Sequence, residues 1–330
     1  MRRVWMTLLA VALVLSACGT GGSDTSSSTV QPGSPTTTEG GTTSTTTGAD
    51  QPATTTTVPV SSSTTTTSTV PASSTTTTVQ PGLTEVRVYL MLDDTGETSA
   101  VGPSLVPVAR HVDRTVGVAA AAMEALLKGP TGEEATSIPA LSTTIPSDAR
   151  FLGVRVSDGV ATVNLSKEFE SGGGTFSMGA RLAQVVYTLT QFPTIDEVAF
   201  ELDGERVTVF SSEGLVIDEP LGRADQQEFL PAVFVDSPAY AGSVADPARI
   251  TGVSNVFEAR FTIAIVDNDG LILAEEPVQA SCGTGCWGSF DVTIDYDVDE
   301  AQMGGVIVWV YSPKDGSQID VREYPVWLTP

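Results

Sequence analysis

The stretch GVRVSDGVA, residues 153–161, decides the fold of the middle of this 330-residue chain. Val154 and Val156 alternate with polar neighbours, which is the two-residue period of a half-buried strand. Asp158 and Gly159 then supply the positive φ angles that a tight hairpin turn requires. The sequence therefore predicts a β-hairpin over residues 149–165.

Further strands are predicted on both sides of this hairpin. Apolar residues alternate with polar ones over 85–92 and again over 104–112, with a polar loop between the two segments. A second hairpin is predicted over 197–210, because Asp203-Gly204 repeats the turn signal. These segments supply the strands of one sheet.

Two helices are predicted between these strands. The first covers 116–128, with Thr115 as its N-cap and Gly129-Pro130 at its end. The second has Ser177 as a candidate N-cap and ends at Pro193. The order β-β-α-β-β-α-β-β favours an α+β domain in which both helices pack on one face of a mainly antiparallel sheet.

This domain, residues 84–225, resembles the GerMN domain of sporulation and spore-germination proteins and of many exported actinobacterial lipoproteins. The resemblance runs through about residues 86 to 212 in the same order, and four segments carry it. They are Ala125 to Thr131, Gly153 to Ala161, Leu182 to Leu189 and Val198 to Gly204. The resemblance implies an assembly or interaction module without a known enzyme activity, so it assigns no catalytic residue.

The last part of the chain, residues 230–330, has an all-β pattern. About seven short strands within roughly 100 residues are typical of a β-sandwich. The segments 256–259, 269–275, 288–292 and 312–317 resemble the immunoglobulin-like domain of bacterial spore germination proteins. The predicted strands are 232–235, 248–254, 257–266, 271–278, 289–297, 306–311 and 319–328.

The N-terminus has the features of an export signal, predicted over residues 1–17. Arg2 and Arg3 precede an apolar run of about a dozen residues, which is too short to span a bilayer. Residues 15–19, Leu-Ser-Ala-Cys-Gly, resemble the lipobox of bacterial lipoproteins, which implies that Cys18 carries a lipid. We therefore expect the chain to be anchored to the outer face of the cell membrane. A cleaved signal peptide with a chance cysteine is the alternative.

Residues 18–83 are dominated by serine, threonine, glycine and proline. This composition buries too little apolar surface to offset the entropy of ordering the backbone, so a disordered stalk is predicted. The stalk would lift the folded domains off the membrane. Both a plain linker and an O-glycosylated one fit this composition.

Few side chains are available for chemistry. The chain has one histidine and three cysteines, and its formal net charge of -24 argues against binding to nucleic acid. Cys282 and Cys286 are predicted to form a structural disulfide, since exported proteins favour disulfides. No catalytic residue, cofactor site or metal site is predicted.

Four weaker signals favour ordinary structural roles. His111 lies in a predicted strand, and a hairpin turn explains residues 267–270 better than a calcium loop does. The third signal is a run of aspartates at 295, 297 and 299, for which a solvated face is the simpler interpretation. Three tryptophans, Trp287, Trp309 and Trp327, could stack on sugars, but a place in the sandwich core or at a sheet edge is the favoured interpretation.

The sequence thus predicts a non-enzymatic envelope lipoprotein whose two domains dock onto other envelope proteins, for example by strand addition at a sheet edge. The first alternative is a module that binds the cell wall or a polysaccharide through exposed tryptophans and acidic loops. The second is a hydrolase with an unrecognised site.

Overall fold

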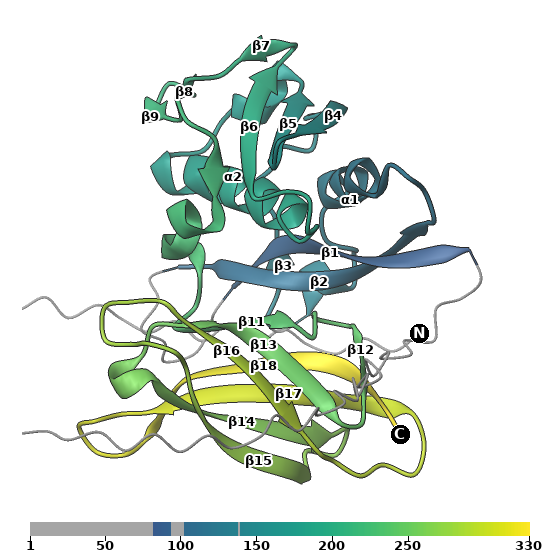
Figure 1. Ribbon diagram of the computed structural model, residues 1–330, viewed down its shortest axis with the longest axis vertical. Coiled ribbons are helices and arrows are strands. Elements are labelled where there is room, and N and C mark those ends of the chain that lie inside the picture. The colour runs from purple at the N-terminus through teal and green to yellow at the C-terminus, as the bar shows by residue number, and fades with distance from the viewer. Residues whose placement is uncertain (1–81, 94–101, 138) are drawn as a thin grey trace, which may run out of the picture. The chain divides into compact units, whose positions relative to one another are not determined.

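The computed structural model describes residues 82–93, 102–137 and 139–330 (Figure 1). The predicted signal peptide, Cys18 and almost all of the predicted stalk lie outside these residues. The described part belongs to one compact unit, in which an α+β domain precedes an all-β domain. Within this part of the chain, we find no helix with the length and hydropathy needed to cross a membrane.

The first domain has two sheets with the two helices between them (Figure 1). Helix α1 (Val118–Leu127) packs against β1 (Leu83–Leu92), β2 (Ser104–Asp113) and β4 (Phe151–Ser157). Helix α2 (Thr175–Leu189) packs against β1 and β6 (Glu197–Leu202). One sheet has the order β2-β1-β3, formed by β1 (Leu83–Leu92), β2 (Ser104–Asp113) and β3 (Leu141–Ser142). The other has the order β10-β6-β5-β4, formed by β4 (Phe151–Ser157), β5 (Val160–Leu165), β6 (Glu197–Leu202) and β10 (Leu221–Gly222).

Two helices, three 3-10 turns and three short strands complete the described part of this domain. The helices are α1 (Val118–Leu127) and α2 (Thr175–Leu189), and the 3-10 turns are η1 (Glu134–Thr136), η2 (Lys167–Glu170) and η3 (Arg223–Phe229). Strand β7 (Glu205–Arg206) pairs with β6, whereas β8 (Val209–Phe210) and β9 (Leu215–Val216) form a separate ribbon.

The α+β fold class is confirmed, and the structure refines it. The strands form two sheets instead of the single predicted one. Strands β5 and β6 run parallel, because α2 forms the crossover between them and returns the chain to the start of the sheet. The other pairings in these two sheets are antiparallel, and the hairpin turn at Asp158 and Gly159 has φ angles of 53° and 83°.

Both predicted N-caps are wrong. Helix α1 begins at Val118, so the hydroxyl of Thr115 accepts a hydrogen bond from Gly117 N before the helix starts, at 3.1 Å. Helix α2 begins at Thr175 with Gly174 as its N-cap, which places Ser177 inside the first turn. In both cases a nearby glycine occupies the cap, and glycine is also favoured there.

The second domain is a sandwich of two sheets, which confirms the predicted class. Its three-stranded sheet has the order β11-β13-β16, and its five-stranded sheet has the order β12-β18-β17-β14-β15. The strands are β11 (Val233–Ser237), β12 (Ser243–Ala245), β13 (Ala248–Ser254), β14 (Arg260–Asp267), β15 (Ile272–Gln279), β16 (Gly288–Ile294), β17 (Gln302–Tyr311) and β18 (Gln318–Thr329). The turn η4 (Phe257–Ala259) replaces the start of the predicted strand 257–266.

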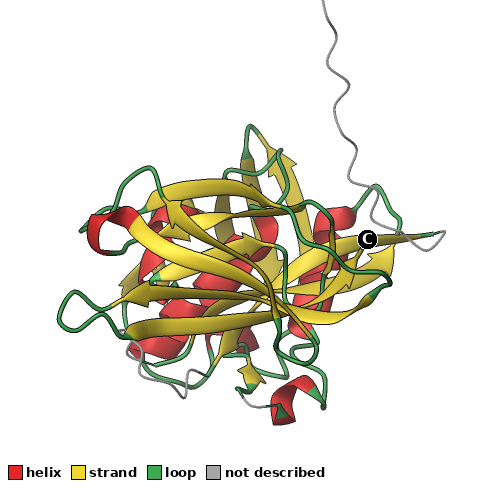
Figure 2. Cartoon of the chain, turned by 90° about the horizontal axis from the view of Figure 1, so that it is seen from below, coloured by secondary structure: helices red, strands yellow, loops and turns green. Residues whose placement is uncertain are grey.

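Apolar side chains join the two domains. Nine buried residues, named here the junction cluster, come from β1, β2, α2, η3, β11 and the residue after η3. They are Tyr89, Met91, Leu105, Ala180, Ala183, Tyr187, Phe229, Leu230 and Phe234. The edge of β2 that faces away from β1 also forms backbone hydrogen bonds. Ala109 N donates to Tyr240 O at 2.9 Å, and Tyr240 N donates to Pro107 O at 2.8 Å. The three-stranded sheet therefore lies next to the first domain, and the five-stranded sheet lies on the far side (Figures 1 and 2).

Candidate functional site

Asp236 is the centre of a charged cluster at the domain junction. Its carboxylate accepts hydrogen bonds from the Tyr89 hydroxyl at 2.5 Å and from Arg87 Nη1 at 3.1 Å. Arg223 Nη1 lies 3.1 Å from the same carboxylate. We name these four residues, together with Tyr187, the Asp236 cluster. A single carboxylate of the second domain thus meets two cations and a hydroxyl of the first.

Strand geometry explains how β1 contributes two members. Arg87 and Tyr89 are two residues apart, so their side chains leave the same face of β1. The residues between and beside them, Val86, Val88 and Leu90, point to the opposite face and are buried. Sequence alternation therefore gives β1 one face for its own domain's core and one for the junction.

Arg223 reaches the cluster from the start of η3. Its guanidinium carbon lies 4.7 Å from the centre of the Tyr187 ring and 5.6 Å from the centre of the Tyr89 ring. Its Nε donates to Thr190 Oγ1 at 2.8 Å and its Nη2 donates to the Tyr89 hydroxyl at 3.1 Å. Cation–π contact and charged hydrogen bonds together fix this side chain.

The electrostatics of the cluster favour an ionised Asp236 and neutral tyrosines near pH 7. Burial alone would raise the pKa of Asp236, but the guanidiniums of Arg223 and Arg87 hold that pKa below its ordinary value. Burial raises the pKa of the Tyr89 and Tyr187 hydroxyls, and the charge of Asp236 adds to this shift. None of these three side chains therefore changes protonation near pH 7, which is what a general acid or base must do.

A groove of about 480 Å³ opens beside this cluster. Tyr187, Arg223 and Gln227 of the first domain form one wall. The other side is formed by paired strands β13 and β16, among them Val253 and Ser289. Pockets at domain interfaces commonly bind ligands. Since the charges of Arg223 and Asp236 are already paired with each other, the groove offers shape and hydrogen bonds more than an unpaired charge.

The sequence did not single out any member of the Asp236 cluster. Alternation places Arg87 and Tyr89 only on the outer face of a strand, Arg223 lies near the end of the predicted first domain, and Asp236 follows the predicted strand 232–235 of the second. The partners are separated by up to 149 residues, so no local pattern connects them. The alternation of β1 gave the one available signal, because it placed Arg87 and Tyr89 on a face away from the core.

His111 lies on the exposed part of β2. Its partner in the β1–β2 register is Glu85, and Nε2 of the histidine is 3.9 Å from Glu85 Oε2. Burial raises the pKa of Glu85, although His111 and Arg87 partly oppose this shift. The side chain of His111 is 53% exposed, and the sequence-based expectation of a surface or half-buried histidine agrees with this position.

The acidic segments of the second domain have structural roles or exposed positions. Asp267 Oδ1 accepts hydrogen bonds from Asp269 N at 2.9 Å and Leu271 N at 2.8 Å, which builds the predicted hairpin turn. The aspartates at 295, 297 and 299 are exposed and follow the end of β16. Within the described part of the chain, no three histidine, cysteine or acidic side chains gather as a possible metal site.

The three tryptophans differ in exposure. Trp309 is buried and its ring meets that of Tyr311 at 6.4 Å between centroids. Trp287 is half-buried and packs against the junction cluster. Trp327 is 42% exposed. Of the three, Trp327 alone presents a largely open ring face, so they do not form one common platform for a sugar.

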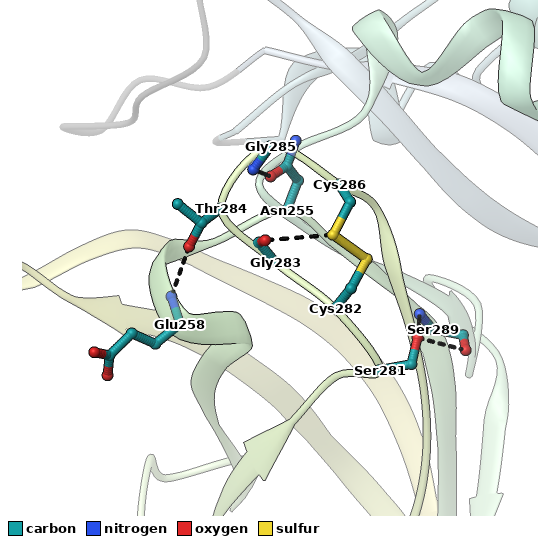
Figure 3. Close-up of a disulfide and its surroundings, with 9 residues drawn as sticks. All are labelled: Asn255, Glu258, Ser281, Cys282, Gly283, Thr284, Gly285, Cys286 and Ser289. Atoms are coloured by element: carbon teal, nitrogen blue, oxygen red, sulfur yellow. Dashed lines mark hydrogen bonds between the residues drawn. A yellow bond between two sulfur atoms is a disulfide. The ribbon is translucent and has the colours of Figure 1, made fainter. Parts of the chain in front are cut away.

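Cys282 and Cys286 are joined as a disulfide in the loop between β15 and β16 (Figure 3). This loop is bound to η4 and to the residues just before it. Thr284 N donates to Val256 O at 2.9 Å, Gly285 N donates to Asn255 Oδ1 at 2.9 Å, and Glu258 N donates to Thr284 Oγ1 at 3.0 Å. The disulfide therefore closes a loop that supports η4.

Two family models match the chain. The model named Germane, described as sporulation and spore germination, matches residues 87–208. The model named Gmad2, described as the immunoglobulin-like domain of bacterial spore germination, matches residues 232–317. The two matches fall on the two domains of the structure. No curated protein matches the chain.

Some solved structures are similar in part. A Clostridium perfringens protein assigned as a lipoprotein is 24% identical, with 44% of this chain and 90% of that chain covered and a TM-score of 0.30. The first GerMN domain of the sporulation protein GerM from Bacillus subtilis is 24% identical, covers 43% of this chain and 99% of that chain, and has a TM-score of 0.33. The tandem GerMN domains of the same protein are 18% identical, with 64% and 61% covered and a TM-score of 0.35.

These structural similarities are weak, so the assignment depends on the family models and on the order of the two domains. Both models match in the order that the fold shows, with the α+β domain first. The α+β domain therefore matches the Germane model, described as sporulation and spore germination, and the sandwich that follows it matches the Gmad2 model of an immunoglobulin-like domain.

Proposed function

We propose that this protein is a non-enzymatic lipoprotein of the cell envelope, anchored to the membrane through Cys18, and that its two domains together bind other envelope proteins. The lipobox-like sequence around Cys18 supports the anchor. The families of both domains are domains of sporulation and germination proteins. The proposal assigns the folded part to recognition and no part of it to catalysis.

The proposal depends mainly on one observation, which is that the side chains of the Asp236 cluster are paired with one another across the junction. Here charged and hydroxyl-bearing side chains of both domains converge, and each is bonded to its partner across the junction. A catalytic site requires groups that face a substrate with a matched pKa. Arg223 and Asp236 instead hold the two domains in a fixed relative orientation, and a binding surface built from two domains requires such an orientation.

The rigid junction makes the groove a composite surface. Its walls come from α2 and η3 on one side and from β13 and β16 on the other. A partner that contacts both walls gains from the fixed geometry, because little conformational freedom is lost on binding. This supports a docking role that neither domain would perform alone.

Site-specific photo-crosslinking in intact cells tests the proposal. A photoreactive amino acid at Ser289, which is exposed beside the groove, should give a discrete protein adduct. The same amino acid at Gly132, exposed on a loop of the first domain, is the control for random collision. Two results together would contradict a purely binding role. One is that no adduct forms at Ser289, at Gly132 or at other surface sites, and the other is that the purified chain turns over a wall or ester substrate.

A further inference from the structure

The outer face of the five-stranded sheet is unusually apolar. In β17, Val306, Val308 and Val310 point into the sandwich core, so the alternating residues Ile307, Trp309 and Tyr311 point outward. The outward side of an antiparallel sheet is normally polar and solvated. On β17 it consists of large apolar and aromatic side chains instead.

Neighbouring strands extend this face. Met303 of β17 lies opposite Trp327 of β18, and Val321 occupies an outward position farther along β18. These three side chains and Tyr311 are between 40% and 49% exposed. We name Met303, Ile307, Trp309, Tyr311, Val321 and Trp327 the distal face. Trp309 is buried and Ile307 half-buried at its centre, and the four exposed side chains surround them. Exposed apolar residues grouped on one face mark interaction surfaces.

The other sheet of the sandwich shows what such a face can do. On the three-stranded sheet, the outward-pointing Phe234 is 1% exposed, because it belongs to the junction cluster and the first domain covers it. The distal face lies on the opposite side of the sandwich, the side from which Figure 2 is viewed. One outer face of the second domain is therefore covered by the first domain, whereas the other carries four apolar side chains that are between 40% and 49% exposed.

A pocket of about 530 Å³ lies at the Tyr311 end of the distal face. Thr262 and Pro277, which are paired across β14 and β15, line it together with Phe257 and Tyr311. Phe257 is 54% exposed and Tyr311 is 49% exposed, so the pocket walls are aromatic and open. Its aromatic and apolar lining can accept a large apolar side chain of a partner.

The wall of this pocket is held in a strained conformation. Glu258 and Ala259 have φ angles of 54° and 57°, in a region that is unfavourable for residues other than glycine. The hydrogen bond from Glu258 N to Thr284 Oγ1 ties this turn to the loop closed by Cys282 and Cys286. Strain of this kind persists where surrounding structure enforces it, and it is typical of ligand-binding sites.

The charges around the distal face determine which partner fits. Glu275 and Glu323 are exposed and point outward with it, and Glu258 lies at the pocket. Arg260 is a cation at the pocket, but the chain as a whole has a net charge of -24. A second copy packed face to face would place carboxylates against like carboxylates, which is unfavourable. Charge complementarity favours a basic surface.

We propose that the distal face binds a protein partner that inserts one large apolar side chain into the Phe257–Tyr311 pocket and places lysines or arginines against Glu275 and Glu323. This inference rests on the proposed docking role and adds a second contact, on the second domain alone and apart from the groove. The aromatic centre supplies the buried anchor that interfaces require, and the carboxylates select against acidic partners.

A defined peptide tests the inference. The probe is a fluorescein-labelled peptide in which lysine alternates with leucine around one central tryptophan, and its counterpart has glutamate in place of lysine. Fluorescence anisotropy is measured with the full chain, which carries Cys18→Ser so that it remains free of lipid. The lysine peptide should bind at least tenfold more tightly than the glutamate peptide, and added salt should weaken it.

Matched variants locate the binding. Val321→Ser and Tyr311→Ser should each weaken the lysine peptide about tenfold or more, and Glu323→Lys should reduce its preference over the glutamate peptide. Leu152→Ser is the control, since Leu152 and Val321 are both 48% exposed but lie in different domains. Unchanged melting temperatures show that the variants remain folded.

Other outcomes would overturn the inference. Equal binding of both peptides, no binding of either, or equal losses for Leu152→Ser and Val321→Ser would each exclude a basic partner at this face. If the chain sediments as a dimer and Val321→Ser abolishes the dimer, the face is assigned to a second copy. If purified wall polysaccharide retains the chain and Trp327→Ala abolishes this retention, the face is assigned to a sugar. A crosslink at Ser289 without one at Val321 would leave the proposed function intact while refuting this site.

Discussion

Asp236→Asn should weaken the domain junction strongly. The substitution keeps the size of the side chain and leaves an acceptor for the Tyr89 hydroxyl, but it removes the charge that Arg87 and Arg223 face. Removing one partner of a fully buried ion pair typically costs about 3–5 kcal/mol, because a buried charge remains. The side chains of Asp236, Arg87 and Arg223 are 18%, 24% and 31% exposed, so solvent screens part of this effect. We therefore expect a loss of about 2–3 kcal/mol.

Calorimetry and urea unfolding of residues 82–330 measure this loss. For a domain pair of this size the expected destabilisation corresponds to a fall of about 5–10 °C in melting temperature. Trp287 packs against the junction cluster, so its fluorescence should change as the junction opens. Asp291→Asn is the matched control, because Asp291 pairs with Arg249 through exposed side chains.

Two results would refute the reasoning about Asp236. One is a loss for Asp236→Asn that does not exceed the loss for Asp291→Asn. The other is separate unfolding of the two domains in the unsubstituted chain, since a stable junction couples their unfolding.

Three further predictions follow from the same structure, and a fourth follows from the sequence around Cys18. Gly252→Ala should destabilise the second domain by more than about 2 kcal/mol in urea unfolding, because an added Cβ would overlap the Phe234 carbonyl oxygen, whereas Gly132→Ala meets no neighbouring atom and should change little. The difference in melting temperature between Asp236→Asn and the unsubstituted chain should shrink as the pH falls below about 4, since a carboxylate with a lowered pKa stabilises the fold only while it is ionised. Replacing Cys282 and Cys286 together by serine should cost about 2 kcal/mol, as expected for a short closed loop, and hydrogen exchange should rise first in η4. Cys18→Ala should move the chain from the membrane fraction to the soluble fraction on immunoblots of fractionated cells, and an unchanged distribution would contradict the proposed anchor.

Local chemistry allowed much of the fold to be predicted. Asp158-Gly159 formed the expected turn, because its φ angles depend on two adjacent residues. The seven strands predicted for the sandwich are present, but β12 was missed. That strand has three residues and pairs in parallel with β18, more than 80 residues later in the chain, so neither its length nor its partner leaves a local pattern.

Features that depend on distant partners could not be predicted. The division of the first domain into two sheets depends on the helices packing between them, which the period of each strand does not reveal. The Asp236 cluster joins residues from β1, η3 and β11, and its existence follows from the docking of two domains. By contrast, Cys282 and Cys286 were found because their spacing within one loop is itself the signal.

The position of β1 has a mechanical consequence. It is the central strand of its sheet and pairs with β2 along its whole length, from Leu83 opposite Asp113 to Leu92 opposite Ser104. A pull along the strand axis at Leu83 would load these bonds simultaneously instead of breaking them one after another. The force would pass from β2 through the backbone pairing with Tyr240 into the second domain. Tension on a tether at this end would therefore be shared by both domains before either one opened.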